Sequence, residues 1–286
     1  MTVPSARDKA RTWKGSLELR YAHRDGRTTA RDRHEGPLRV LKALYPDGPA
    51  CCEHTLVHPP GGLAGGDELQ VTVTLEPGAQ AVITTPGATR FYRSSGAQAT
   101  QAVVLTVGEG ARLEWLPLET LAYPGCLASN RVRFDLAQGA QMIGWDLLAL
   151  GLPAAEAPFD SGRIEQSLAW PGVWLEQGHI SSDDVALLDG PAGLAGYRVL
   201  GTMWCASGSP WDSRSLGSLL DAAREVLPAH RADALAGATA PDPRLVAVRM
   251  LAHRVEPVFE VWRQVRRAWR RLLWQCADSE PRIWRM

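Results

Sequence analysis

The chain has 286 residues, and its 31 basic and 31 acidic side chains give a formal net charge of zero. This balance gives no overall charge that would indicate binding to nucleic acid or an acidic tail. The length is sufficient for one large all-β domain or two smaller domains. The five cysteines include no C-x-x-C pair, so neither a disulfide framework nor a zinc ribbon is expected.

No segment resembles a signal peptide or a membrane span. Residues 1–16 are polar and basic, without the apolar centre of a secretory signal. The most apolar stretch, Met142 to Leu152, is too short to cross a bilayer and contains Asp146. We therefore expect a soluble cytoplasmic protein with no membrane partner and no nucleic-acid partner.

The N-terminal part reads as strands after a loose start. Residues 1–14 are expected to form a flexible tail. Leu17, Leu19 and Tyr21 then alternate with polar residues, which is the pattern of a half-buried strand. The Asp25-Gly26 pair that follows is typical of a hairpin turn.

A strand, a Gly-Ala turn and a second strand recur from Glu68 onward. The turns are centred on Gly78, Gly110 and Gly139, and they return about every 30 residues, which is the period of a stacked repeat. Such units bury their faces on one another. Residues 15–210 are therefore predicted to form a mostly β scaffold of stacked β-layers, although an ordinary meander would give the same spacing.

The composition changes near residue 210, after which the pattern becomes helical. Leucines in residues 213–227 follow a 3.6-residue period. Apolar residues at steps of three and four predict the longest helix over residues 245–272, with Pro257 kinking or splitting it. Residues 211–286 are therefore expected to be a helical, partner-facing region packed on the β scaffold.

The last predicted helix also carries many arginines and tryptophans. Arginine runs are usually the solvated face of a helix, but Trp and Arg are enriched where proteins bind each other. We accordingly expect a partner-docking surface there. Its candidate contact residues are Trp262, Arg266, Trp269 and Arg270.

Two neighbouring segments raise the question of metal chemistry. The run Cys51-Cys52-Glu53-His54, followed by His58, holds several groups that can ligate a metal. On an extended strand, however, Cys52, His54 and His58 are spread too far apart for one closed site. A buried cysteine with partly exposed histidines is the simpler interpretation. A metal-dependent β-fold hydrolase that uses His54, His58 and Asp67 is kept as the alternative.

The stretch from His58 to Asp67 (HPPGGLAGGD) is a tight turn between two strands. Its glycines and prolines exclude a regular helix or an inner strand. Neither a P-loop nor a dinucleotide-binding spacing is present, and a strand rather than a helix follows. Asp67 closes the turn, where a carboxylate can cap backbone N–H groups.

Several motifs together resemble one family. They are Gly36 to Val40 (GPLRV), His58 to Asp67, Thr84 to Ala88 (TTPGA), Phe91 to Ser94 (FYRS), and Glu114 to Pro117 (EWLP) with Glu119-Thr120. In this order they are similar to the UreD family of urease accessory proteins, also called UreH. The resemblance covers residues 15 to about 210, and Leu118 departs from it where a glutamine is expected.

The resemblance implies a mostly β fold, a stacked, helical arrangement of β-sheets with a few C-terminal α-helices. It also implies a scaffold without enzymatic activity. Such a protein binds apo-urease and recruits UreF, and through it the GTPase UreG, for nickel insertion. It implies no tightly bound cofactor, with nickel only in transit along an internal route. By position, Asp67 and Glu176 are the candidate residues on that route, while a simple turn cap is an equal alternative for Asp67.

Overall fold

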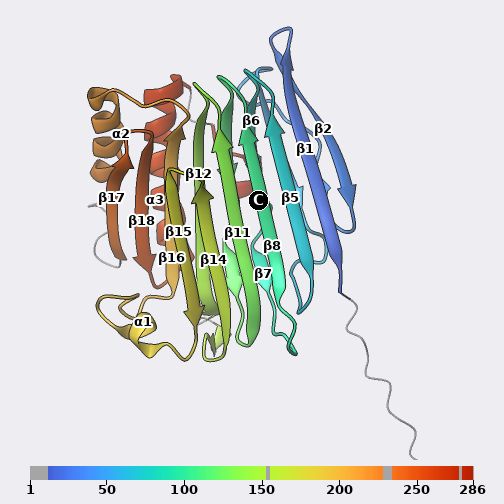
Figure 1. The fold of residues 1–286 in the computed structure, drawn as a ribbon, viewed down its shortest axis with the longest axis vertical. Helices are drawn as coiled ribbons and strands as arrows, with labels where there is room; N and C mark the ends of the chain where they lie inside the picture. Colours follow the sequence, from blue (N-terminus) through green and yellow to red (C-terminus); the bar gives the residue numbers. More distant parts are fainter. Residues whose placement is uncertain (1–11, 153–154, 228–233, 277–278, 286) are drawn as a thin grey trace, which may run out of the picture.

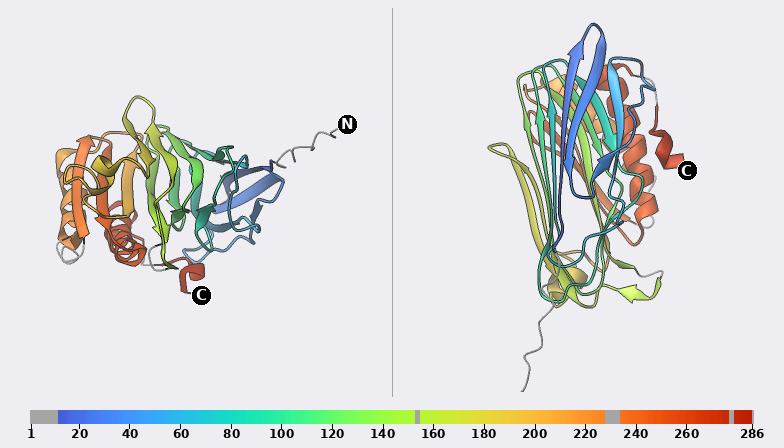
Figure 2. Two further views of the ribbon diagram at one scale, coloured as in Figure 1. Left: turned by 90° about the horizontal axis from the view of Figure 1, so that it is seen from below. Right: turned by 90° about the vertical axis from the view of Figure 1, so that its right-hand side faces the viewer.

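A computed structural model describes residues 12–152, 155–227, 234–276 and 279–285. Two β-sheets lie face to face, and two helices cover the outer side of only one of them (Figures 1 and 2). The first sheet has the strand order β15-β14-β11-β8-β5-β1-β2, and the second the order β17-β18-β16-β12-β9-β6-β4-β3. The mostly β fold class predicted from the sequence is confirmed.

The elements have the following bounds. The first sheet contains β1 (Lys14–Arg24), β2 (Arg27–Glu35), β5 (Glu68–Leu75), β8 (Ala99–Val107), β11 (Cys126–Leu136), β14 (Gly162–Trp170) and β15 (Trp174–Ser181). The second contains β3 (Arg39–Val40), β4 (Cys51–Val57), β6 (Gln80–Thr84), β9 (Arg112–Leu116), β12 (Gln141–Leu152), β16 (Val199–Ser207), β17 (Ala234–Asp242) and β18 (Leu245–Ala252). Short strands β7 (Thr89–Phe91), β10 (Thr120–Ala122) and β13 (Ala157–Pro158) attach beside β12. The helices are α1 (Val185–Asp189), α2 (Ser213–Val226), α3 (Val255–Trp274) and the 3₁₀ turn η3 (Arg282–Arg285).

The repeat seen in the sequence builds the stack. Each repeat places one strand in the first sheet and the next strand in the second, as in β5–β6, β8–β9 and β11–β12. Like strands of successive repeats pair in parallel. The three turns have Gly78, Gly110 and Gly139 at φ values of 73°, 62° and 70°. This left-handed conformation favours glycine, which explains why glycine returns at the same place in each repeat.

The strands of the second sheet separate two apolar layers, because successive side chains of a strand point to opposite faces. In β12, Met142 and Leu148 face the first sheet. Ile143 and Trp145 face the helices. We call the first layer the inter-sheet layer and the second the helix layer. Five tryptophans of the strands pack in these layers, since all are at most 8% exposed: Trp115, Trp145, Trp170, Trp174 and Trp204.

The helix predicted for residues 245–272 is wrong in its first part. Leu245–Ala252 is strand β18, which pairs with β16, and α3 begins only at Val255. A strand that is buried on both faces is apolar at nearly every position, and such a run also satisfies a helical period. Pro257 lies in the first turn of α3, where the absent N–H has no helical partner to lose, so it does not split the helix.

The C-terminal region is thus not purely helical. The strands β17 and β18 extend the second sheet, so this sheet runs across the boundary predicted near residue 210. Of the tail predicted for residues 1–14, residues 1–11 lie outside the described residues, and Lys14 already belongs to β1. Within the described ranges, no helix is long and apolar enough to span a bilayer.

Candidate functional site

Three side-chain amides form a row across the first sheet. Gln101 pairs in register with Asn130, and Asn130 with Gln166, on the adjacent strands β8, β11 and β14. Register partners point to the same face of a sheet. That face is the inner one, because Val103 and Val132, two residues further along β8 and β11, belong to the inter-sheet layer. Polar side chains are thus placed inside an otherwise apolar layer.

A second polar row on the opposing sheet lies in register in the same way. Asp146 of β12 pairs with Thr202 of β16, which pairs with Arg249 of β18. These three residues alternate with neighbours that face the helix layer, such as Trp145 and Val248. The second row therefore faces the first sheet. Together with Glu176 of β15, the two rows form what we call the polar layer.

The two rows meet at Asp146. The Nε2 of Gln101 donates to Oδ1 of Asn130 at 3.2 Å, and Nδ2 of Asn130 donates to Oδ1 of Asp146 at 3.3 Å. Gln166 donates through Nε2 to the other oxygen of Asp146. Burial, with a smaller contribution from the nearby Glu176 charge, raises the pKa of the Asp146 carboxyl to about 7, against the opposing effect of the two amide hydrogen bonds. Asp146 therefore exchanges its proton near neutral pH.

The polar layer ends at an ion pair. Thr202 donates its hydroxyl hydrogen to Oε1 of Glu176 at 2.7 Å. Arg249 donates to Oε2 of Glu176 from Nε at 2.7 Å and from Nη2 at 2.6 Å. The Glu176 side chain is 31% exposed and that of Arg249 is 48% exposed. This end of the layer consequently reaches solvent.

The row of amides leaves room beside Gln166. Its register partner on β15 is Gly178, whose inward neighbours Trp174 and Ile180 belong to the inter-sheet layer. A Cβ atom built on Gly178 would meet no atom within 4 Å. Among the described residues, no donor contacts the buried Oε1 of Gln166. A side chain at position 178 would therefore find open space on the sheet face that carries Gln166 and its unused oxygen.

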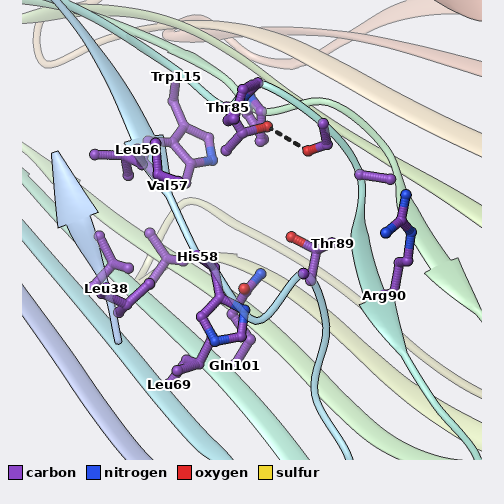
Figure 3. A pocket seen from close by; sticks show the side chains of 17 residues that line it. Leu38, Leu56, Val57, His58, Leu69, Thr85, Thr89, Arg90, Gln101 and Trp115 are labelled. Carbon is purple, nitrogen blue, oxygen red and sulfur yellow. Dashed lines mark hydrogen bonds between the residues drawn. The ribbon is translucent and has the colours of Figure 1, made fainter. Parts of the chain in front are cut away.

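The other end of the layer opens into a cavity. Gln101 lines a cavity of about 230 Å³ between the sheets, together with His58, Trp115 and the Thr85–Arg90 loop. In Figure 3, Gln101, His58 and Thr89 lie around the same opening. Burial lowers the pKa of His58, which favours the neutral imidazole, while the nearby Asp67 charge acts in the opposite sense. The glycine-rich stretch singled out in the sequence thus forms part of the rim.

The family resemblance predicted Asp67 and Glu176 as candidate residues on the nickel route. Glu176 lies in the polar layer, whereas Asp67 does not. Asp67 accepts hydrogen bonds from the backbone N–H of Trp13 at 3.1 Å and of Ala64 at 2.8 Å. Both of its oxygens are thereby occupied in capping the turn, beside the rim residue His58. The geometry matches the turn-cap alternative and leaves Asp67 next to the cavity.

Within the described residues, the structure assembles no metal site that would support the alternative function, a metal-dependent hydrolase. His54 is 5% exposed and its Nδ1 lies 2.8 Å from the hydroxyl of Tyr21, deep in the inter-sheet layer. Over the described ranges, no three His, Cys, Asp or Glu side chains come close enough to hold a metal ion. His54, His58 and Asp67 are therefore not brought together.

The four residues proposed for a partner surface are buried, so this prediction is wrong for the chain by itself. Trp262 and Trp269 are fully buried, and Arg266 and Arg270 are each 2% exposed. Both arginines bind the buried carboxylate of Glu114 on β9. These four side chains therefore lie on the face of α3 that packs against the second sheet, and not on the face that meets solvent.

Sequence reasoning missed most of the polar layer, although a signal was present. Asp146 interrupts the most apolar stretch of the chain, and Gln101, Asn130 and Gln166 each take an inward position of an alternating strand. A polar residue at a core position is more informative than an exposed apolar one. What the sequence did not reveal is that these positions share one level of the stack.

Comparison with known proteins matches one family over nearly the whole chain. The family model described as "UreD urease accessory protein" matches residues 14–285. The chain belongs to the UreD family. A protein of Leptothrix cholodnii called urease accessory protein UreD is 51% identical over 276 residues, which is 96% of this chain and 99% of that relative. Relatives with the same name from Polaromonas sp. and Polaromonas naphthalenivorans are each 50% identical over 275 residues, 96% of this chain and all of theirs.

Membership of this family supports a role in urease maturation. It also agrees with an accessory rather than a catalytic part, as the names of the relatives suggest. The family resemblance drawn from the sequence motifs is confirmed, and it extends to the C-terminal third of the chain, where no motif had carried it.

Proposed function

We propose that this chain is a cytoplasmic, non-enzymatic scaffold for nickel insertion into urease, and that the polar layer is the internal route of the metal. In this proposal the chain binds apo-urease and recruits UreF and the GTPase UreG. No cofactor is held tightly, and nickel is a cargo. The observation that carries the route is a row of polar side chains from the cavity to solvent. Hydrogen bonds join Gln101 to Asp146 through Asn130, and strand register continues the row from Asp146 through Thr202 to Arg249.

The chemistry of the layer suits a cation in transit. Ni²⁺ accepts oxygen ligands such as carboxylates and carbonyls as well as imidazole. Asn130 and Gln166 offer amide oxygens, and Asp146 offers a carboxylate that is close to half protonated at neutral pH. Such a group can release a proton when a cation arrives and take one up when it leaves. Weak contacts at several successive positions allow passage better than one closed site does.

The route is tested by one chemical and one steric change. Asp146→Asn removes the carboxylate, and Gly178→Val adds a side chain to the open space beside Gln166. Each variant is co-expressed with urease and the other accessory proteins, and nickel per urease active site is measured together with urease activity. The proposal expects both quantities to fall about tenfold, while urease still co-purifies with the variant.

The matched control for the steric change is Gln177→Val. Gln177 adjoins Gly178 on β15 but faces outward and is exposed, so the same side chain is added outside the layer. Normal nickel loading is expected with this control. Normal loading with both Asp146→Asn and Gly178→Val would show that nickel does not use the polar layer.

A further inference from the structure

The carboxylate of Glu176 already has a cation beside it. Thr202 occupies one of its oxygens, and two nitrogen atoms of Arg249 occupy the other. These contacts use three of the roughly four acceptor sites of a carboxylate, and the remaining site lies on Oε1, next to the guanidinium charge. In this state the guanidinium charge of Arg249 disfavours a second cation at Glu176.

The position of Arg249 makes this pairing more than an ordinary surface ion pair. β15 is the last strand of the first sheet, whereas the second sheet continues through β18 and β17. Arg249 of β18 therefore bridges the sheets at the edge where the inter-sheet layer ends. It also shares its rung with Thr202 and Asp146. A cation that leaves Asp146 toward this edge meets a guanidinium charge first.

We propose that Arg249 is a gate residue, whose guanidinium occupies the cation position of Glu176 and blocks this end of the polar layer until the ion pair opens. This inference rests on the proposed nickel route. In the closed state the positive charge repels a divalent cation and Glu176 is neutralised. When Arg249 moves away, Glu176 becomes a free carboxylate beside the Thr202 hydroxyl, and a divalent cation can replace the guanidinium.

A purely structural role would give different results. If Arg249 only joins β15 to β18, then removing its charge lowers stability and leaves metal binding unchanged. If Arg249 competes with the metal, then a neutral side chain uncovers a cation site that contains Glu176. Arg249→Lys retains a positive charge and Arg249→Gln does not, so the two variants separate charge from the loss of the arginine itself.

The test is equilibrium dialysis of the full-length chain against NiCl₂ at pH 7.5. We expect Arg249→Gln to bind one Ni²⁺ about tenfold more tightly than the parent chain, because a repelling charge is removed and a carboxylate is freed. Arg249→Lys should bind like the parent. The double variant Arg249→Gln/Glu176→Gln should lose the gain. Thermal unfolding of each variant controls for folding, and Arg249→Met replaces the Gln variant if that variant is unstable.

The outcomes separate the gate from the route. No gain in affinity with either neutral variant, or a gain that survives in the double variant, would overturn the gate. Reduced urease loading with Asp146→Asn in the same case would leave the route intact. A gain that depends on Glu176, combined with normal loading by both Asp146→Asn and Gly178→Val, would support the cation site at Arg249 and overturn the route.

Discussion

The two interior layers of this protein both contain buried charge, but they neutralise it differently. In the helix layer, Glu114 binds Arg266 and Arg270, and Arg270 also binds Asp47 at 2.6 Å. Opposite charges are matched in one closed cluster. In the inter-sheet layer, Asp146 is met by the amides of Asn130 and Gln166, and no arginine or lysine among the described residues forms an ion pair with it.

This difference in partners gives the two charges different properties. Burial by itself would lower the pKa of Arg270, but the nearby carboxylates of Glu114 and Asp47 outweigh it and raise the pKa, so the guanidinium stays charged. The amides around Asp146 do not offset its burial, so its proton is exchangeable near pH 7. The ion cluster is suited to holding α3 on the second sheet. The amide-bound carboxylate is suited to changing its charge when a cation approaches.

The largest expected effect comes from opening the ion cluster. Glu114→Gln leaves Arg266 and Arg270 buried without their shared carboxylate, so the free energy of unfolding should fall by about 3–5 kcal/mol. Urea unfolding measures this change. Asp221→Asn is the control, because Asp221 is 72% exposed and its contact with Arg224 spans 3.9 Å; its effect should stay below about 0.5 kcal/mol. If Glu114→Gln lowered the free energy of unfolding no more than the control does, the ion cluster would not be what holds α3 on the second sheet.

A change of pH should act on the inter-sheet layer. An unfolded Asp releases its proton near pH 4, whereas folded Asp146 does so near pH 7. The folded state therefore binds the proton more tightly, and its stability falls as pH rises through this window until it levels off above about pH 7. Relative to Asp146→Asn, the parent should lose about 3 kcal/mol between pH 5 and pH 8. Urea titrations measure the free energy of unfolding of both proteins at each pH. If the two plots of this free energy against pH run parallel, the Asp146 pKa is not raised.

Two glycines allow the packing of the two layers to be compared. A Cβ on Gly144 would lie 2.5 Å from the Trp204 ring in the inter-sheet layer, and one on Gly201 would lie 2.7 Å from Trp262 and from Val258 in the helix layer. Each Gly→Ala change should cost about 1–3 kcal/mol through overpacking. Gly237→Ala is the control, since its Cβ would meet nothing within 4 Å.

Thermal unfolding of these three variants would show which of the two layers accommodates an added methyl group at the lower cost in stability. Trp204 stacks on Phe134 with ring centroids 5.5 Å apart and an interplanar angle of 2°, so its ring has little freedom to move. We therefore expect Gly144→Ala to be no milder than Gly201→Ala. A neutral Gly144→Ala variant would indicate that the inter-sheet layer is loosely packed.

Local pattern was sufficient to predict the repeat and its strands. The alternation in Glu68–Leu75 and the recurring glycines at Gly78, Gly110 and Gly139 reflect geometry within a few residues, which a sequence displays directly. The same reasoning failed at Leu245–Ala252, because a strand between two layers is apolar on both faces. In that segment the local pattern fits a helix as well as a strand, and only the pairing with β16 shows that it is a strand.

The sequence by itself determined the stacked β architecture, the family, and the presence of a polar residue in the most apolar strand. Only the tertiary structure decided what that residue meets. Asp146 reaches Asn130 and Gln166, 16 and 20 residues away, because the stack brings successive repeats to one level. Likewise Arg266 finds Glu114 across 152 residues. A local period sets the face on which a side chain lies, whereas its partner depends on the packing of distant segments.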